Sequence, residues 1–281
     1  MTRTALIDVG GGYRAIYGAG VMDRCLDEKI SFDHCYGVSA GSANMTSFIA
    51  GQNGRSHRFY TEYSFRKEYA SPSNFFKDHN FVDLDYVYGT LSNHDGEYPL
   101  DYEAFEANPA EFTVIACDAR DGAPHYFTKS DVGYDNYDIM KASSAVPVAC
   151  EPYYIGGVPY FDGGIADPVP VHRAAAEGYD RIVLVLTRPK DVLREQRKDV
   201  GPSKVLARTW PAAAEKLLNR YRLYNDEVAL AKRYEKEGNV LILAPEDLYG
   251  LSTLTKSYEG LERMYRQGYA DASRITDFLT R

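Results

Sequence analysis

The sequence predicts an α/β fold, a three-layer α/β/α sandwich in which helices cover both faces of a mostly parallel central sheet. In the first fifty residues, short apolar runs alternate with segments whose apolar residues recur at helical spacing. Residues 182–186 are apolar throughout, which is typical of a strand that helices bury on both faces. The 281 residues are enough for one large core, and we expect a single domain over residues 1–281.

The amino-terminal part predicts a β-α-β-α unit. Residues 4–9 form an apolar run that ends in three glycines, and residues 15–29 carry apolar side chains at helical spacing. A second strand is expected near residues 33–38, followed by a helix over residues 40–50 that Gly51 ends. Strands joined through helices in this way pair in parallel.

The middle of the chain predicts a helical insertion over the sheet, around residues 52–110. This stretch is polar and aromatic, and turn residues separate three expected helices near residues 55–65, 84–91 and 102–108. Two strands then follow at residues 112–117 and 125–128, and Asp121-Gly122 between them favours a tight hairpin.

The rest of the chain alternates helices and strands and becomes mainly helical over residues 188–281. A glycine-rich strand end is expected near residues 159–166. The other predicted elements are helices at residues 137–143, 169–177, 211–236 and 257–279 and strands at residues 182–186 and 240–243.

A Gly-x-Ser-x-Gly motif, Gly37-Val38-Ser39-Ala40-Gly41, lies between the second predicted strand and the following helix. In such a strand-turn-helix, the turn strains the serine backbone and lifts the hydroxyl clear of the sheet. The first amides of the helix then point at any anion formed there. We therefore predict that Ser39 is a nucleophile and that the Ala40 amide belongs to an oxyanion hole; the alternative is a chance match in a loop.

Gly10, Gly11 and Gly12 end the first predicted strand, and without β-carbons they let backbone N–H groups approach a neighbouring active site. We predict that they complete the oxyanion hole. An alternative is a dinucleotide site, because Gly10, Gly12 and Ala15 also fit Gly-x-Gly-x-x-Gly/Ala. That site needs an acid at the end of the second strand, whereas Asp33 lies at its beginning.

A nucleophilic serine needs a base, and Asp162 is the better candidate. It ends an apolar stretch, Tyr160-Phe161-Asp162, ahead of two glycines, and burial there raises the basicity of a carboxylate. Of the six histidines, only His172 lies close to a catalytic-looking segment, and a Ser-Asp-His triad with Asp162 is the alternative. An ordinary Asp-Gly-Gly turn is the other interpretation.

Three segments, residues 10–14, 37–41 and 162–164, occur in the order and strand-end positions of the patatin-like phospholipase family, and the chain resembles a bacterial member. Residues 142–147 are also similar to the family's segment ahead of its catalytic Asp. The motifs cover roughly the first 175 residues. The family usually has an acid immediately before the glycines and a glycine after the basic residue, where this chain has Val9 and Ala15.

The resemblance implies a serine acyl hydrolase that cleaves fatty acyl esters of phospholipids or related lipids through an acyl-enzyme. It implies a Ser-Asp dyad of Ser39 and Asp162, oxyanion donors in the glycine loop, and no cofactor or metal. Arg14 stands where the family keeps a basic residue, and we expect it to support the oxyanion loop. The alternative function is a catalytically silent lipid- or acyl-binding module of the same fold.

Charge and composition exclude other classes. The net charge of -8 argues against a nucleic-acid partner. No secretory leader and no apolar run of about 20 residues is seen, so a cytoplasmic protein is expected. The four cysteines form no close pair, which argues against zinc or redox sites.

One stretch of the acidic chain is basic. Residues 188–233 contain 12 Lys and Arg against 6 Asp and Glu. This favours either a solvated helix face or transient contact with the inner membrane surface. The sequence does not assign an oligomeric state.

Overall fold

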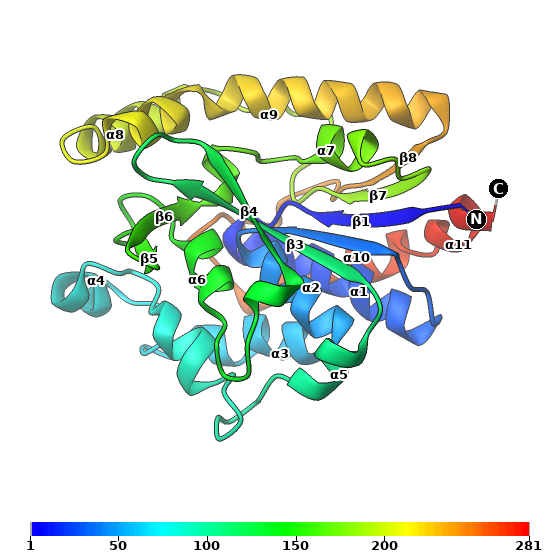
Figure 1. The fold of residues 1–281 in the computed structure, drawn as a ribbon, viewed down its shortest axis with the longest axis horizontal. Coiled ribbons are helices and arrows are strands. Elements are labelled where there is room, and N and C mark those ends of the chain that lie inside the picture. Colours follow the sequence, from blue (N-terminus) through cyan, green and yellow to red (C-terminus); the bar gives the residue numbers. More distant parts are fainter. Residues whose placement is uncertain (1, 281) are drawn as a thin grey trace.

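The computed structural model describes residues 2–280 and contains one mixed sheet between two layers of helices (Figure 1). Within this part of the chain the strands are β1 (Thr4–Asp8), β2 (His34–Val38), β3 (Glu111–Asp118), β4 (Pro124–Thr128), β5 (Tyr153–Ile155), β6 (Val158–Asp162), β7 (Arg181–Val185) and β8 (Val240–Leu243). Their order is β5-β6-β3-β2-β1-β7-β8, and β4 also pairs with β3. β8, β7, β1, β2 and β3 are parallel, while β4, β5 and β6 pair antiparallel.

The helices are α1 (Ile16–Asp27), α2 (Ala40–Ile49), α3 (Arg55–Thr61), α4 (Pro72–Asp78), α5 (Tyr102–Ala107), α6 (Asp138–Ser144), α7 (Val171–Ala176), α8 (Arg197–Leu206), α9 (Pro211–Glu237), α10 (Tyr258–Asp271) and α11 (Arg274–Thr280). Short helical turns are η1 (Gly12–Ala15), η2 (Tyr63–Phe65), η3 (Tyr86–Thr90), η4 (Lys129–Asp131) and η5 (Gly163–Ile165). No helix within residues 2–280 combines the length and apolar content that crossing a membrane requires.

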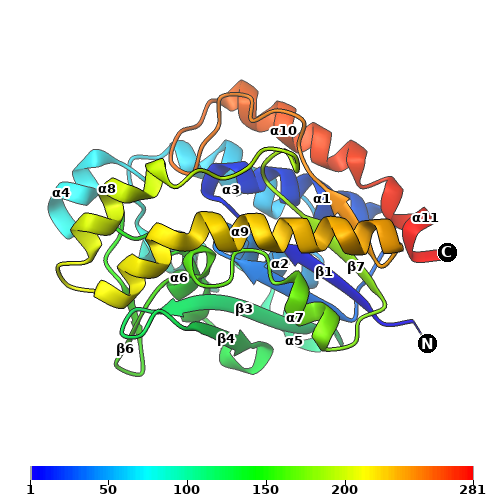
Figure 2. The ribbon, with the colours of Figure 1, turned by 90° about the horizontal axis from the view of Figure 1, so that it is seen from above.

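The two faces of the sheet pack against different helices, which confirms the predicted three-layer sandwich. Successive side chains of a strand point to opposite faces, so Leu6 packs with α1 and α2 while Ala5 and Ile7 pack with α7 and α9. Figures 1 and 2 show α9 along one face and α1, α2 and α10 on the other. All four cysteines are buried free thiols.

The insertion between α2 and β3 packs on the α2 side of the sheet. Phe59, Val87 and Phe105 share one hydrophobic cluster with Phe48 of α2. The helix α4 was not predicted, because the sequence of this segment is polar and has no apolar periodicity. Its start is nevertheless marked by Pro72 in the first turn and by Ser71, whose hydroxyl accepts a hydrogen bond from the Asn74 amide.

Other elements also differ from the expectation, and the predicted helix over residues 55–65 is divided into α3 and η2. The predicted helix over residues 257–279 is divided into α10 and α11, with Ser273 between them donating its hydroxyl to the Ala270 carbonyl. The helix α8 was missed because Pro202 lies inside it. The strand β5 was missed although Gly156 and Gly157, both with positive φ, form a tight turn between β5 and β6.

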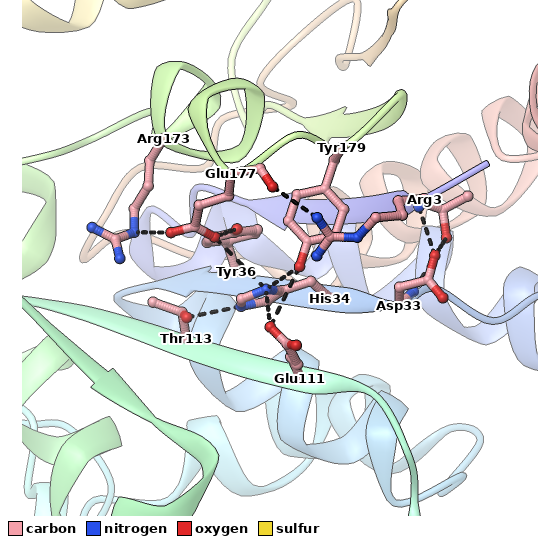
Figure 3. A network of polar contacts seen from close by, with 10 residues as sticks. Arg3, Asp33, His34, Tyr36, Glu111, Thr113, Arg173, Glu177 and Tyr179 are labelled. Atoms are coloured by element: carbon pink, nitrogen blue, oxygen red, sulfur yellow. Dashed lines mark hydrogen bonds and ion pairs between the residues drawn. The ribbon is translucent and has the colours of Figure 1, made fainter. Parts of the chain in front are cut away.

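A buried polar network ties together the amino-terminal end of β2, far along the strand from Ser39 (Figure 3). The two ring nitrogens of His34 lie 2.8 Å from the Tyr179 hydroxyl and 2.8 Å from the Thr113 hydroxyl. Glu111 and Glu177 approach the same ring at 3.0 and 3.9 Å. Burial lowers the pKa of His34 to about 4, against the opposing effect of the two glutamates, so the ring is neutral near pH 7.

Candidate active site

Two strands meet end to end on one edge of β3 and bring Ser39 to Asp162. Val38, the last residue of β2, pairs with Ile115, and Asp162, the last residue of β6, pairs with the next residue, Ala116. Because β4 pairs with the opposite edge of β3 at these positions, β2 and β6 share the remaining edge. They run in opposite directions, so their carboxyl ends face each other. The Ser39 hydroxyl donates to Asp162 Oδ2 at 2.6 Å across 123 positions of sequence.

The backbone of Ser39 is strained, as the Gly-x-Ser-x-Gly turn at residues 37–41, which we name the elbow, predicts. Its φ of 55° and ψ of -135° are rare for a residue with a β-carbon. The Ser39 N–H donates to the Ser143 hydroxyl at 2.8 Å, and that hydroxyl donates to the Ile115 carbonyl at 2.6 Å. Ser143 lies in the segment that resembles the family, but no role was predicted for it.

The glycines of the elbow are required by close packing. A β-carbon on Gly37 would lie 2.5 Å from the Ser42 α-carbon, and one on Gly41 would lie 2.4 Å from the Asp8 carbonyl oxygen. Both distances are far below van der Waals contact, so α2 packs this closely on β1 and β2 only because these positions lack side chains. The start of α2 is thereby held directly over the strand ends.

Asp162 is buried and held by two hydrogen bonds. Its Oδ2 accepts from Ser39, and its Oδ1 accepts from the Gly164 amide at 2.7 Å. Burial raises the pKa of Asp162, while these hydrogen bonds and the positive charges of Arg220 and Arg194 oppose the rise. The predicted desolvation of this carboxylate is therefore observed, and its basicity is above that of an exposed Asp.

The glycine loop lies against the elbow, and all three glycines have positive φ. A β-carbon on Gly10 would lie 2.1 Å from the Val38 carbonyl oxygen and 3.1 Å from the Ala40 nitrogen. The Gly10 N–H donates to Asp8 Oδ1 at 2.9 Å, so this geometry does not fit the predicted role of Gly10 as an oxyanion donor. Among residues 2–280, the amides of Gly11, Gly12 and Ala40 have no hydrogen-bond acceptor.

Two side chains that sequence reasoning missed hold this loop. Asp8 is fully buried and accepts from Gly10 and from the Asn44 side chain at 2.9 Å, and burial raises its pKa to about 6. The Thr187 hydroxyl donates to the Gly10 carbonyl. Asp8 could have been noticed in the sequence, because it is a lone acid inside an apolar strand. No sequence pattern indicates that Thr187 contacts a loop residue 177 positions away.

Arg14 folds back over the glycine loop, where the sequence placed a supporting basic residue. Its side chain is 5% exposed, and a β-carbon on Gly11 would lie 3.0 Å from its Nη2. Nη2 donates to the Thr253 hydroxyl at 3.4 Å, while the buried Nε has no partner. Burial, with a smaller effect of nearby arginines, lowers the pKa of Arg14 to about 9, so it keeps its charge at neutral pH.

The histidine triad does not form. His172 Nδ1 lies 3.9 Å from carboxylate oxygens of both Asp167 and Glu227, and His172 does not pair with Asp162. In the described residues these three side chains are the group with the spacing of metal ligands. Burial and the neighbouring Asp167 raise the pKa of Glu227 to about 10. The raised pKa keeps Glu227 protonated near pH 7, which reduces the repulsion between the two adjacent buried carboxyl groups.

The nucleotide alternative also fails on geometry. Asp33 is the acid that a ribose would need, and it lies at the amino-terminal end of β2. Its carboxylate accepts a hydrogen bond of 2.6 Å from the Thr4 N–H. It therefore lies at the opposite end of this strand from the glycine loop and Ser39.

Two cavities meet at Ser39, and Ser39, Val146, Thr253 and Leu254 line both. The first, which we name the apolar cavity, has a volume of about 100 Å³ and extends under the insertion. The second, which we name the basic cavity, has a volume of about 500 Å³ and extends under α8 and α9. The apolar cavity is lined mainly by Ala43, Phe59, Tyr60, Leu84, Val87 and Met140. The basic cavity is lined by Arg14, Arg188, Arg194, Lys198 and Arg220.

Comparison with known proteins gives several matches. The sequence profile of patatin-like phospholipases matches residues 9–175, and a domain of unknown function (DUF6363) matches residues 210–279. The uncharacterized protein YjjU of Escherichia coli (strain K12) is 33% identical over 201 residues, which are 68% of this chain and 53% of that protein. The chain thus spans about half the length of that relative.

A solved structure shares the fold. The crystal structure of VipD from Legionella pneumophila superposes with a TM-score of 0.57 over 98% of this chain and 67% of that chain, at 13% sequence identity. The glycine loop, the elbow and Asp162 all lie inside the segment that the family profile matches. Since that profile covers more than half of the residues, the chain belongs to the patatin-like phospholipase family, a family of lipid acyl hydrolases.

Proposed function

We propose that this protein is a serine acyl hydrolase that uses a Ser39-Asp162 dyad to cleave fatty acyl esters of phospholipids or related lipids. The observation that carries the proposal is the hydrogen bond of 2.6 Å from the Ser39 hydroxyl to Asp162, on a strained elbow beside amides without acceptors. A hydroxyl in contact with a desolvated carboxylate is the arrangement that general-base activation of a nucleophile requires.

In the acylation step, Ser39 Oγ attacks the ester carbonyl and its proton passes to Asp162. The developing oxyanion accepts hydrogen bonds from the amides of Gly11, Gly12 and Ala40, each worth on the order of 3 kcal/mol to the barrier. The C–O bond to the alcohol then breaks, and the alcohol takes the proton from Asp162. The raised pKa of Asp162 supports this role, because the protonated acid has to persist until the alcohol leaves.

In the deacylation step, Asp162 takes a proton from water, and the resulting hydroxide attacks the acyl carbonyl. The bond to Ser39 Oγ breaks, and Oγ recovers a proton from Asp162. The apolar cavity is the proposed site of the acyl chain, since it opens at Ser39 and buries apolar side chains of the insertion. No metal or organic cofactor has a step in this mechanism.

The test compares native protein with Ser39→Ala and Asp162→Asn, using a fluorophosphonate probe and a panel of nitrophenyl esters. We expect Ser39→Ala to abolish labelling and Asp162→Asn to lower the rate of hydrolysis by at least about a hundredfold. Because burial raises the pKa of Asp162, the native rate should fall with acidification around a midpoint above the ordinary value of 3.8. The exposed pair Ser273→Ala and Asp277→Asn are matched controls that should behave as native protein.

The same probe separates the alternative function, a silent lipid- or acyl-binding module. Such a module would retain the fold and the cavities but would not form an acyl-enzyme. Equal labelling of native protein and Ser39→Ala would contradict the hydrolase proposal and favour the module.

We also propose that lipid reaches the site during transient contact with a membrane surface. Phe76 of α4 is 84% exposed and Leu193, just ahead of α8, is 71% exposed. The helices α4 and α8 lie at the same end of the molecule (Figures 1 and 2). Lys77 follows Phe76 in the sequence, and Lys198 lies five positions after Leu193. Exposed apolar side chains together with lysines are typical of a surface that contacts anionic lipids. Co-sedimentation with anionic vesicles should decrease in Phe76→Ser/Leu193→Ser, and equal sedimentation would exclude this surface. A cytoplasmic location remains a prediction.

A further inference from the structure

The basic cavity holds more positive charge than the protein neutralises. It is lined by Arg14, Arg188, Arg194, Lys198 and Arg220, and its carboxylates are Asp162 and Asp199, so five positive charges face two negative ones. The lining therefore carries a net charge of +3 at neutral pH. Concentrating like charges in a partly buried space is unfavourable unless an anion occupies it.

The carboxylate of Asp199 is already engaged. It is buried and accepts from Arg220 Nε at 2.8 Å, and Arg194 approaches it at 3.5 Å. The two arginines share one acid, and the buried Nε of Arg194 has no partner. Arg194, which lines the basic cavity, thus keeps a hydrogen-bond donor that the protein does not satisfy.

Two other arginines have no acid. Within residues 2–280, neither Arg14 nor Arg188 forms an ion pair. The side chain of Arg14 is only 5% exposed, and its Nε has no hydrogen-bond partner. In the described residues its side chain donates one hydrogen bond, the long one of 3.4 Å to the Thr253 hydroxyl. A buried guanidinium without a carboxylate is costly in a folded chain unless a ligand supplies the missing acceptors.

We propose that the basic cavity binds a phosphate monoester on the alcohol side of the acyl ester, so that the preferred substrate is an acyl glycerol phosphate. This inference rests on the proposed function, because it places the ester at Ser39, where the two cavities meet. The acyl chain then lies in the apolar cavity, and the alcohol with its phosphate lies in the basic cavity.

The charge of the cavity selects among phospholipids. A phosphate monoester carries about −1.5 to −2 at pH 7 and offers three acceptor oxygens, which suits several guanidinium groups at once. A phosphocholine diester carries a single negative charge and a cation that the arginines repel. A monoacylglycerol has no phosphate and leaves the arginines without acceptors.

The inference also gives a role to the carboxy-terminal part of the chain. Arg220 lies in α9, inside the segment that matches a domain of unknown function, and Arg188, Arg194 and Lys198 lie between β7 and the first turn of α8. The nucleophile and base come from the family segment, and most of the head-group contacts come from residues beyond it. On this view the carboxy-terminal part determines which alcohol is accepted.

The first experiment measures binding without hydrolysis, in Ser39→Ala protein, by titration calorimetry with glycerol 3-phosphate, inorganic phosphate and glycerophosphocholine. We expect glycerol 3-phosphate to bind at least tenfold more tightly than glycerophosphocholine and inorganic phosphate. Inorganic phosphate that binds as tightly as glycerol 3-phosphate would assign the cavity to a free anion and overturn the proposal, as would equal binding of glycerophosphocholine.

The second arm tests the residues. In the same background, Arg188→Gln should weaken glycerol 3-phosphate binding at least tenfold, and Lys198→Gln should weaken it less. Both side chains lie at least partly in solvent, so neither change opens a buried cavity. Arg208→Gln, an exposed arginine of the same region that lines neither cavity, is the control. Native affinity in both Arg188→Gln and Lys198→Gln would contradict the proposal.

The third arm uses active protein and two substrates with the same acyl chain, a lysophosphatidate and a monoacylglycerol. Relative to native protein, kcat/KM of Arg188→Gln should fall at least tenfold more for the lysophosphatidate than for the monoacylglycerol. Equal losses would overturn the head-group assignment. If Ser39 is not the nucleophile, Ser39→Ala will not abolish hydrolysis, while glycerol 3-phosphate will still bind in the two binding experiments. The results therefore distinguish a failure of the proposed function from a failure of the head-group assignment.

Discussion

At the residue scale, the conformation of Ser39 depends on a partner outside the elbow. Its N–H is buried and donates to Ser143, whose hydroxyl is itself anchored on the Ile115 carbonyl of β3. The strained φ of 55° is thus held by the hydrogen bond that the Ser39 N–H donates to Ser143 of α6, as well as by the turn itself. We infer that Ser143 positions Ser39, because it contacts the Ser39 backbone rather than the hydroxyl of the proposed nucleophile.

We expect Ser143→Ala to lower kcat about tenfold or more while leaving KM nearly unchanged, since the proposed nucleophile, Ser39, moves but both cavities persist. The buried Ser39 N–H loses its acceptor, so the free energy of unfolding should fall by about 1–3 kcal/mol. Steady-state kinetics and urea denaturation measure the two effects. Ser130→Ala, at an exposed serine that lines neither cavity, is the control. A native kcat in Ser143→Ala would show that the hydrogen bond between the Ser39 N–H and Ser143 is not needed to position Ser39.

At this scale the contact between Ser39 and Asp162 could be predicted from local motifs, while the catalytic roles of the two residues stay predictions. Ser39 and Asp162 were chosen as partners from glycine-flanked strand ends, and the structure places their side chains in contact. It did not foresee that the Gly10 amide turns toward Asp8. Contacts such as Thr187 to Gly10 join distant segments and depend on the fold, which no local pattern records.

At the element scale, most helices and strands were predictable because their apolar periodicity is strong. The bounds of α2, α9 and β8 agree with expectation to within about one residue. The elements that were missed, α4, α8 and β5, are short, polar or interrupted by proline, so tertiary packing rather than pattern decides their structure.

The direction of β6 was not predicted, and this direction decides which residues meet at the site. The segment was recognised as a strand end, but the two-glycine turn after β5 was not interpreted as a hairpin. That hairpin sends β6 back along β3 antiparallel to β2, which is why Asp162 arrives opposite Ser39. The sequence therefore indicated the two residues of the site but not the pairing that joins them.

At the scale of the whole molecule, we propose that residues 1–281 form a single domain, with the insertion and the carboxy-terminal helices as integral layers. The central strand β1 pairs with β2 on one side and with β7 on the other, and β8 extends the same sheet. Tyr224 and Val228 of α9 pack on the β1–β2 face. The basic stretch contributes Arg188, Arg194 and Arg220 to the cavity, as well as Leu193 to the proposed membrane surface.

The polar network at the far end of the sheet predicts how stability depends on pH. Burial lowers the pKa of His34 to about 4, below the 6.5 of an exposed His, with Arg173 and Arg3 acting in the same direction and Glu111 and Glu177 against it. Between pH 6.5 and 4, His34 is mostly protonated in the unfolded chain but mostly neutral in the folded protein. His34 therefore makes the free energy of unfolding fall with acidification, by up to about 1.4 kcal/mol per pH unit.

Denaturation at several pH values tests this effect. In His34→Gln, which keeps hydrogen-bonding capacity, the slope between pH 4 and 6.5 should be shallower than in native protein. His125→Gln, at an exposed position, should leave the native slope in place. Identical slopes in native protein and His34→Gln would mean that other groups set the acid sensitivity.

The end-to-end meeting of β2 and β6 has a consequence for how this scaffold diversifies. Consecutive residues of a strand advance by about 3.3 Å, so one peptide unit of β3 sets the spacing of the proposed proton transfer. Neither the loops of the insertion nor those ahead of α8 contribute to that spacing. Both regions are thus free to change length and composition, altering which lipids enter, while the reactive pair keeps its geometry.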